Sequence, residues 1–356
     1  MNFSKMYNRY INKKGEVVGV ANLKTSYMGI ELKNPIIMGA STLSGNLDFV
    51  KKQEKNGIAA VVYKTIFEKD IQLENLEVSE ELNEYEERNA EMINPSSKID
   101  DFGPESHILK LKEFKENLSI PVIASLNAIN KSSWIEYAKK IEETGVDAME
   151  INLFYSPESF EKTSCEIEKE QVDILREVRK TVKIPVSVKL SPYYTNCLNM
   201  IKQFQEAGAD GFLLFNKFIE PEIDVENEKF KIQWNISHLD ENSHSLKFIG
   251  TSFKNIEADI CAGTGIITSD DIIKMILVGA PAVQIVSAFY KDNEDVVQEL
   301  LLGLSQWMDK NNYDSISKFR GKLAKCNLAN PYSYNIAQYL DILKDSTEIL
   351  NEHHTI

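Results

Sequence analysis

Polar residues that could bind or transform a small molecule stand at the ends of short apolar runs. These positions are Ala40-Ser41, Lys64-Thr65, Asn127, Asn152, Lys189, Asn216, Gly263-Thr264-Gly265 and Ser287. A lysine inside the run IPVSVKL, which ends at Leu190, is costly to bury without a partner. The lysines and asparagines of this set together predict a site for an electron-rich or anionic ring. For either lysine alone, an ion pair inside the fold is the alternative interpretation.

The segment Gly263-Thr264-Gly265 is typical of a phosphate-binding turn. A helix is expected directly after it, with Thr268 or Ser269 as the N-cap. Backbone N–H groups at the start of a helix attract anions, so the segment predicts a phosphate site. A simple turn without a ligand is the alternative. The phosphate interpretation gains weight if the segment follows the seventh strand of a barrel, where such sites are built.

The elements that must position these residues alternate between apolar strands and amphipathic helices. Apolar runs predict strands at 36–41, 58–64, 120–127, 147–153, 184–190, 210–215, 259–263 and 281–286. The 3.6-residue period predicts helices at 47–55, 133–144, 166–181, 196–207, 269–278 and 293–307. This order predicts an α/β fold, a closed (β/α)8 TIM barrel. An open doubly wound sheet is the alternative, but the G-x-G-x-x-G turn that it requires is missing.

The expected barrel spans residues 21–326 and carries insertions over its C-terminal mouth at 68–110 and 217–256. Residues 1–20 and 327–356 are expected to be terminal extensions. Residues 68–91 hold ten acidic side chains, which predict a solvated helix or lid face, with an acidic partner-binding tract as the alternative. The aromatic and charged residues of 217–256 predict short antiparallel strands over the mouth.

Composition and charge exclude several classes of function. The chain has 356 residues, of which 43% are hydrophobic and 26% charged, and a formal net charge of −14. This acidic balance argues against binding to nucleic acid or to an anionic membrane surface. No apolar run reaches the roughly 18 residues of a membrane span, and no signal-peptide core is present at the N-terminus. The four cysteines form no C-x-x-C pair, so we expect a cytoplasmic protein without a metal, cluster or disulfide.

A series of short segments matches one known family in order. The segments are Asn34-Pro35, Gly39-Ala40-Ser41, Tyr63-Lys64-Thr65, Glu150-Ile151-Asn152-Leu153, Val188-Lys189-Leu190-Ser191-Pro192-Tyr193, Gly263-Thr264-Gly265-Ile266 and Val283-Gln284-Ile285. On these residues the chain resembles the dihydroorotate dehydrogenases over about residues 23–323, most closely the cytosolic class 1 branch. Residues 319–323 further resemble the C-terminal helix of that branch.

The resemblance implies an FMN-dependent (β/α)8 oxidoreductase without a metal. Lys189 matches a lysine beside flavin N1/O2, where positive charge stabilises the anionic reduced ring. Asn216 and Asn94 match asparagines that hold the substrate pyrimidine. The remaining residues matched to FMN contacts are Ala40, Ser41, Lys64, Thr65, Asn127 and Asn152, with Thr264, Gly265 and Ser287 on the phosphate side.

The implied reaction is the oxidation of dihydroorotate to orotate in pyrimidine biosynthesis. A base on the loop after the fourth strand removes the C5 proton, and hydride passes from C6 to flavin N5. Fumarate or another soluble acceptor then reoxidises the flavin. The resemblance also implies a homodimer without nucleic acid or membrane partners. Two alternatives are a flavin-dependent paralogue that acts on another cyclic amide or enone, and a barrel that has lost catalysis and serves as a binding subunit.

The loop after the fourth expected strand departs from the family pattern. The family has Asn-x-Ser-(Cys or Ser)-Pro-Asn there, whereas this chain has Asn152-Leu-Phe-Tyr-Ser-Pro-Glu158. A direct count places Tyr155 at the position of the base, and one inserted residue places Ser156 there, directly before a proline. We predict Ser156 as the base, with Tyr155 and Cys165 as alternatives. The fourth interpretation is that no base exists and that the substrate is another compound.

Overall fold

Eight parallel strands close into a barrel. The computed structural model describes residues 10–11, 17–18, 21–67, 104–128, 131–153, 155, 160–217, 222–231, 236–238, 241–291, 295–331 and 334. The barrel strands pair with their neighbours in chain order, and the last pairs with the first, which closes the ring. The predicted TIM barrel is therefore confirmed, and the open sheet is wrong. The strands are β5 (Ile36–Met38), β6 (Ala60–Val62), β8 (Val122–Asn127), β9 (Ala148–Asn152), β10 (Val186–Leu190), β11 (Gly211–Leu214), β14 (Asp259–Ala262) and β15 (Val283–Ile285).

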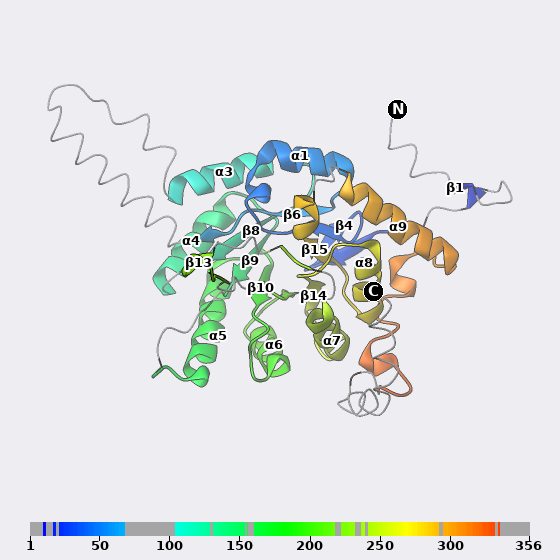
Figure 1. Cartoon of the computed structure of the whole chain (residues 1–356). Coiled ribbons are helices and arrows are strands. Elements are labelled where there is room, and N and C mark those ends of the chain that lie inside the picture. The colour runs from blue at the N-terminus through cyan, green and yellow to red at the C-terminus, as the bar shows by residue number, and fades with distance from the viewer. Residues whose placement is uncertain are drawn as a thin grey trace, which may run out of the picture.

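One helix follows each barrel strand within the described residues, and the helices surround the strands (Figure 1). Their apolar stripes explain this position: in α5, for example, Val172, Leu175 and Val178 are buried against the barrel. Two of these helices, α3 and α7, were not predicted. The helices are α1 (Leu47–Asn56), α3 (Pro104–Asn117), α4 (Lys131–Glu143), α5 (Ser164–Thr181), α6 (Cys197–Glu206), α7 (Ser243–Ser252), α8 (Ser269–Val278) and α9 (Val296–Lys310).

Alternate residues of each strand point to opposite sides of the barrel wall, which gives two apolar layers. Ile36 and Val61 pack outward under the helices, whereas Ile37 and Val62 fill the interior. The N-terminal end of the interior is closed by the hairpin β3 (Thr25–Tyr27) and β4 (Ile30–Leu32). Its buried Tyr27 donates a hydrogen bond to the Phe212 carbonyl at 3.2 Å. A ligand must therefore enter from the carboxyl ends of the strands.

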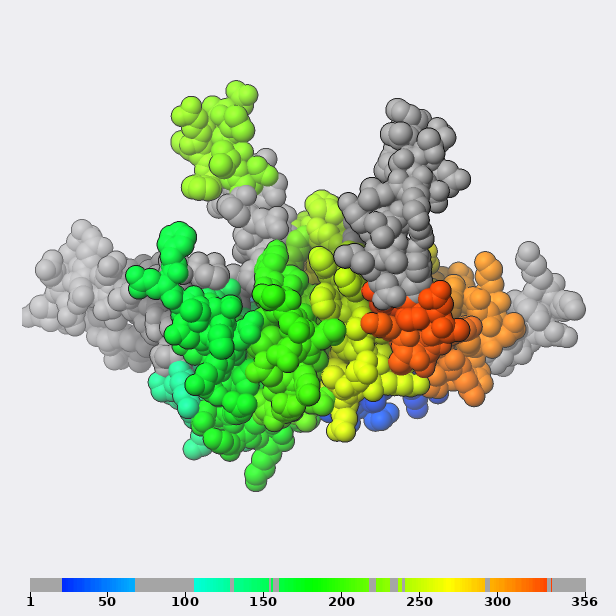
Figure 2. Space-filling view, turned by 90° about the horizontal axis from the view of Figure 1, so that it is seen from below, coloured from blue at the N-terminus to red at the C-terminus, as the bar shows by residue number. Residues whose placement is uncertain are grey.

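The predicted insertions are seen in part. The acidic tract 68–91 lies outside the described residues, and the segment 68–110 ends within α3. The predicted strands of 217–256 are present as one hairpin, β12 (Glu222–Asp224) with β13 (Lys229–Lys231), but α7 occupies the rest. This hairpin stands out from the body in Figure 2. Of the expected extensions, the structure describes a small pair at 10–11 and 17–18 and, after the barrel, 327–331 and 334.

The chain after α9 does not form the helix that the resemblance implied. Residues 319–323 are turns between two short 3₁₀ helices, η6 (Ile316–Lys318) and η7 (Lys325–Asn327). The ring of Phe253 packs against the backbone of these turns. A Cβ atom at Gly321 would lie only 2.2 Å from Phe253 Cε1, and Gly321 has a left-handed φ of +74°.

Gly321→Ala is therefore expected to destabilise the fold strongly. Gly145→Ala is the matched control, because Gly145 also has a left-handed φ (+79°) but no atom within 4 Å of the new Cβ. Both variants incur the left-handed penalty, and only Gly321→Ala adds overpacking of roughly 1–3 kcal/mol. Urea denaturation should show this difference between their free energies of unfolding. Equal values for the two variants would contradict the close packing of Phe253.

Candidate functional site

The alternation of the strands places a set of polar side chains inside the barrel, toward its carboxyl end. On β9, Glu150 and Asn152 point inward, whereas Met149 and Ile151 pack against the helices. In the register of β9 with β10, Asn152 lies opposite Lys189, so Lys189 also points inward. From the other side of the barrel, Gln284 of β15 reaches the same space. The sequence therefore buries polar groups at the end where a barrel can hold a ligand.

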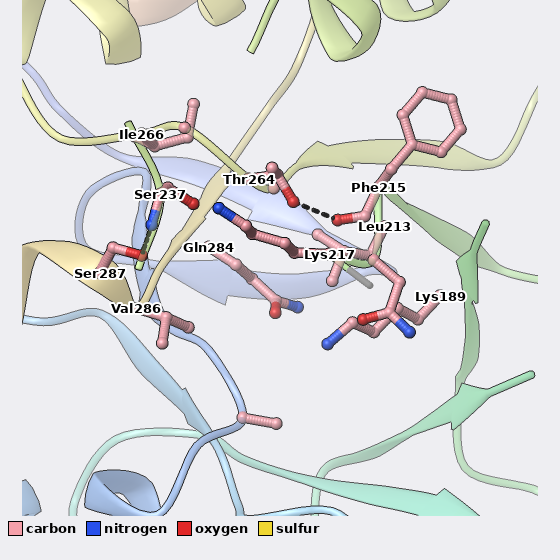
Figure 3. A pocket seen from close by; sticks show the side chains of 14 residues that line it. Lys189, Leu213, Phe215, Lys217, Ser237, Thr264, Ile266, Gln284, Val286 and Ser287 are labelled. Carbon is pink, nitrogen blue, oxygen red and sulfur yellow. Dashed lines mark hydrogen bonds between the residues drawn. The ribbon is translucent and has the colours of Figure 1, made fainter. Parts of the chain in front are cut away.

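Of these groups, Lys189 and Gln284 line a cavity of about 200 Å³ at the carboxyl mouth. Figure 3 shows Lys189 of β10, Gln284 of β15 and Lys217, which follows β11, pointing into it. Six of the predicted site residues line this cavity: Ala40, Lys189, Asn216, Thr264, Gly265 and Ser287. The other lining residues are Leu213, Phe215, Lys217, Ser237, Gly263, Ile266, Gln284 and Val286.

Two of the predicted asparagines, Asn127 and Asn152, do not line the cavity, and Asn152 hydrogen bonds to the third. Asn216 donates a hydrogen bond from Nδ2 to Asn152 Oδ1 at 3.1 Å. Asn127 donates to the Asn152 carbonyl oxygen at 2.7 Å. Asn152 is buried and does not line the cavity. The chain of bonds therefore fixes the amide of Asn216, which does face the cavity.

The predicted residues that follow β5 and β6 lie at the edge of the site. The backbone N–H of Ser41 donates to Ser44 Oγ at 2.9 Å. Thr65 is buried, and its hydroxyl is hydrogen bonded to that of Ser125 at 2.9 Å. Lys64 packs its aliphatic stem against Gly45, at which a Cβ would lie 3.2 Å from Lys64 Cβ. None of these three residues lines the cavity as the described residues enclose it.

Lys189 is a buried basic group at the floor of the cavity. Burial lowers the pKa of its ammonium group, and the carboxylate of Glu150 opposes this by raising it. Burial raises the pKa of Glu150 in turn, and Lys189 and a hydrogen bond from Gln284 oppose that rise. Because Lys189 faces the cavity while its neighbours enclose it, a negatively charged ligand group gains a strong interaction there.

The loop between β14 and α8 has the shape of an anion site. Thr264 has a left-handed φ of +63°, which is unusual for a β-branched residue, and Gly265 follows with +72°. The Thr264 hydroxyl donates to the Phe215 carbonyl at 2.8 Å and holds this shape (Figure 3). A Cβ at Gly265 would lie 2.6 Å from the backbone nitrogen of Asn242, so only glycine fits.

The start of α8 is capped by its own side chains. Thr268 is the N-cap, as predicted, and forms a capping box with Asp271. The Asp271 carboxylate accepts the N–H groups of Ile267 and Thr268 at 3.1 and 2.8 Å. The N–H groups of Ile267 and Thr268 are thus already occupied, and residues 264–266 line the cavity together with Ser287, which follows β15. There Ser287 accepts the N–H of Ser237 at 2.8 Å through its hydroxyl oxygen.

The loop that should carry the base is only partly described. Tyr155 is half-buried, and the ammonium group of Lys162 lies 5.4 Å from the centroid of its ring. Cys165 is exposed in the first turn of α5, next to the N-cap Thr163. The predicted base Ser156 and the predicted substrate ligand Asn94 lie outside the described residues.

Three charged or amide side chains in or next to the cavity were not predicted as site residues from the sequence: Glu150, Lys217 and Gln284. Glu150 and Gln284 are lone polar residues within apolar strands, and this signal was present in the sequence. Lys217 pairs with Glu241 at the rim of the cavity, at 2.7 Å. Its ammonium group also donates to the Ile236 carbonyl at 3.1 Å, which ties the segment 236–238 to the mouth.

The fold and this site define a (β/α)8 barrel with a polar cavity at its carboxyl mouth. The sequence model of the family described as dihydroorotate dehydrogenase matches residues 22–308, and the chain belongs to this family. The resemblance seen in the sequence is thereby confirmed. Members of the family are oxidoreductases that act on CH–CH groups. No helix among the described residues is long and apolar enough to cross a membrane.

This chain matches nearly the whole length of several known relatives. The catalytic subunit of dihydroorotate dehydrogenase B (NAD(+)) from Thermoplasma acidophilum is 28% identical over 310 residues, 85% of this chain and 99% of that protein. The corresponding subunit from Methanocaldococcus jannaschii is 26% identical over 300 residues, which are 83% of this chain and 96% of that protein. Dihydroorotate dehydrogenase A (fumarate) from Lactobacillus delbrueckii subsp. bulgaricus is 25% identical over 310 residues, which are 85% of this chain and 99% of that protein.

Proposed function

We propose that this chain binds FMN in the cavity and oxidises dihydroorotate to orotate in pyrimidine biosynthesis. The observation that carries the proposal is the Lys189 ammonium group at the floor of a cavity that also opens onto the Gly263-Thr264-Gly265 loop. A flavin nucleotide has a ring that becomes negatively charged on reduction and a phosphate at its other end. The cavity offers the Lys189 ammonium group for the ring and the backbone turn at Gly263-Thr264-Gly265 for the phosphate.

The donor groups of the site fit FMN. Lys189, Gln284 and Asn216 would hold the ring, and the loop at Thr264 and Gly265 with Ser287 would hold the phosphate. Ala40 is small and lies on the wall, so it would let a flat ring approach the end of β5. When bound, FMN supplies the acceptor for a hydride. Ser41, Lys64, Thr65, Asn127 and Asn152 would support this arrangement from the edge or from behind.

The residues of the chain would perform three tasks in the reaction. Lys189 would keep a positive charge next to the ring, where negative charge develops. Asn216, oriented by Asn152, would hydrogen bond to the substrate, and Asn94 would be a second ligand. A group on the loop after β9 would remove a proton from the substrate, with Ser156 as our preferred base.

The names of the relatives support a proposal for the electron acceptor. One set is named for NAD(+) and the other for fumarate, and both are soluble acceptors. We propose a soluble acceptor for this chain too. Measuring whether fumarate or NAD(+) reoxidises the reduced flavin distinguishes the two acceptors. A cytoplasmic location and a homodimer stay predictions, and light scattering of the purified protein tests the second.

FMN binding is the first test of this proposal. We expect FMN to copurify with the protein or to bind the apoprotein with a dissociation constant in the low micromolar range or below. Riboflavin is the matched control ligand, because it lacks the phosphate and should bind at least about tenfold more weakly, which corresponds to roughly 1.4 kcal/mol. A colourless protein that leaves the fluorescence of added FMN unchanged would overturn the flavoenzyme proposal.

A further inference from the structure

Glu150 is a buried acid that the proposed reaction does not use. It lies in the middle of β9, its side chain points into the barrel, and its exposed fraction is 0%. Its Oε2 atom accepts a hydrogen bond from Gln284 Nε2 at 2.6 Å. Its Oε1 atom is buried without a hydrogen-bond partner. An acid in this state costs stability, so another interaction must compensate for it.

Lys189 is the cation whose charge lowers the pKa of Glu150 against the effect of burial. The two residues lie on adjacent strands, with Glu150 opposite Ser187, one inward-facing step before Lys189. Cys261 of β14 and Tyr27 of the β3–β4 hairpin also face Glu150, but burial raises the pKa of each well above its usual value, so both are neutral. The other cation of the cavity, Lys217, is already paired with Glu241. Among the described residues that line the cavity, Lys189 is therefore the basic side chain left to interact with Glu150.

Gln284 links Glu150 to the cavity. Because its Nε2 group donates to Glu150, the orientation of the amide is determined. Its Oε1 atom is then directed toward Gly39, at which a Cβ would lie 3.2 Å from this oxygen. The amide keeps one acceptor and one N–H group that Glu150 does not use, and Gln284 lines the cavity together with Ala40.

We propose that Glu150 is a positioning residue of the cavity floor, whose carboxylate keeps Lys189 charged and fixes the donor and acceptor directions of Gln284. The ligand for this floor is the pyrimidine-like edge of a flavin, which carries both donors and acceptors. The identity of this ligand rests on the proposed function, whereas the pairing of Glu150 with Lys189 does not. The loss of Glu150 should therefore change Lys189 even in the protein without flavin.

The titration of Lys189 tests the pairing directly. Full-length protein labelled with [¹³C]lysine is titrated by NMR, and the Lys189 Cε resonance is identified by its absence in Lys189→Met. We expect Glu150→Gln, which keeps the size of the side chain, to lower the titration midpoint of Lys189 by about one pH unit or more, a tenfold change in its protonation equilibrium. Glu241→Gln is the matched control, because it removes an acid at the same cavity that pairs with Lys217 instead.

If the titration midpoint of Lys189 falls no further in Glu150→Gln than in Glu241→Gln, the proposal is overturned.

Thermal unfolding gives a second test if Glu150→Gln folds poorly. The double variant Glu150→Gln/Lys189→Met should unfold at a higher temperature than Lys189→Met alone, because it leaves no unpaired acid in the barrel. Additive losses of stability would count against the pairing. FMN binding by the wild-type chain is measured separately, so the failure of the flavin site and the failure of this pairing are distinguishable.

Discussion

Lys189→Ala is expected to slow the reduction of bound flavin by dihydroorotate by about 10²-fold or more. The side chain supplies the positive charge at the floor of the cavity, and Gln284 and Asn216 offer only dipoles in its place. The fold should be retained, because burial has already raised the pKa of Glu150, which can take up a proton once its partner is lost. Stopped-flow absorbance under anaerobic conditions measures the rate.

Lys183→Ala is the control for this experiment. Lys183 lies six positions earlier, is exposed at the end of α5, and uses its backbone N–H, not its ammonium group, to contact Glu142. The control should reduce its flavin at the wild-type rate. If Lys189→Ala binds FMN and also reduces it at that rate, the charge of Lys189 has no part in the reaction.

The barrel was predictable because its strands are continuously apolar and each is followed by an amphipathic helix. The bounds of α8 agree with the predicted bounds, since Thr268 and Gly279 mark its two ends. The helix α7 was missed because its sequence, SHSLKFIGTS, has a glycine and two serines on its buried side. These small residues are poor helix formers, but Gly250 leaves room for the Tyr334 side chain and Ser245 donates to the Gly263 carbonyl at 2.9 Å, so tertiary packing overrides propensity.

The site was predictable where a polar residue ends an apolar run. Lys189 and Asn216 satisfy this rule and line the cavity. Glu150 and Gln284 lie within strands, where the alternation of the barrel wall decides which way they point. Asn127 and Asn152 satisfy the rule but bind each other behind the wall. Sequence spacing indicates which end of the barrel a residue occupies, but the depth of its side chain depends on contacts between distant strands.

The last prediction concerns the proton-abstracting base on the loop after β9. We expect Ser156→Ala to slow flavin reduction by dihydroorotate by about 10²–10⁴-fold, the usual contribution of a general base. Serine is a weak base at neutral pH, so a hydrogen-bonded neighbour or a water relay must assist it. Tyr155→Phe and Cys165→Ala are the comparison variants, and we expect each to stay within about threefold of the parent. The Tyr155 ring lies beside the Lys162 ammonium group, and Cys165 is exposed on α5, so neither is directed by the described contacts toward the cavity.

The outcomes of this series separate the remaining interpretations. If Tyr155→Phe or Cys165→Ala, and not Ser156→Ala, greatly slows flavin reduction by dihydroorotate, the substituted residue is the base. If the parent reduces its flavin readily and all three variants match it, the base lies on another element of the mouth. If the parent binds FMN but is not reduced by dihydroorotate, the altered loop has lost the proton-abstraction step for this substrate. Assays with other cyclic amides and enones would then identify the compound whose proton this loop can remove.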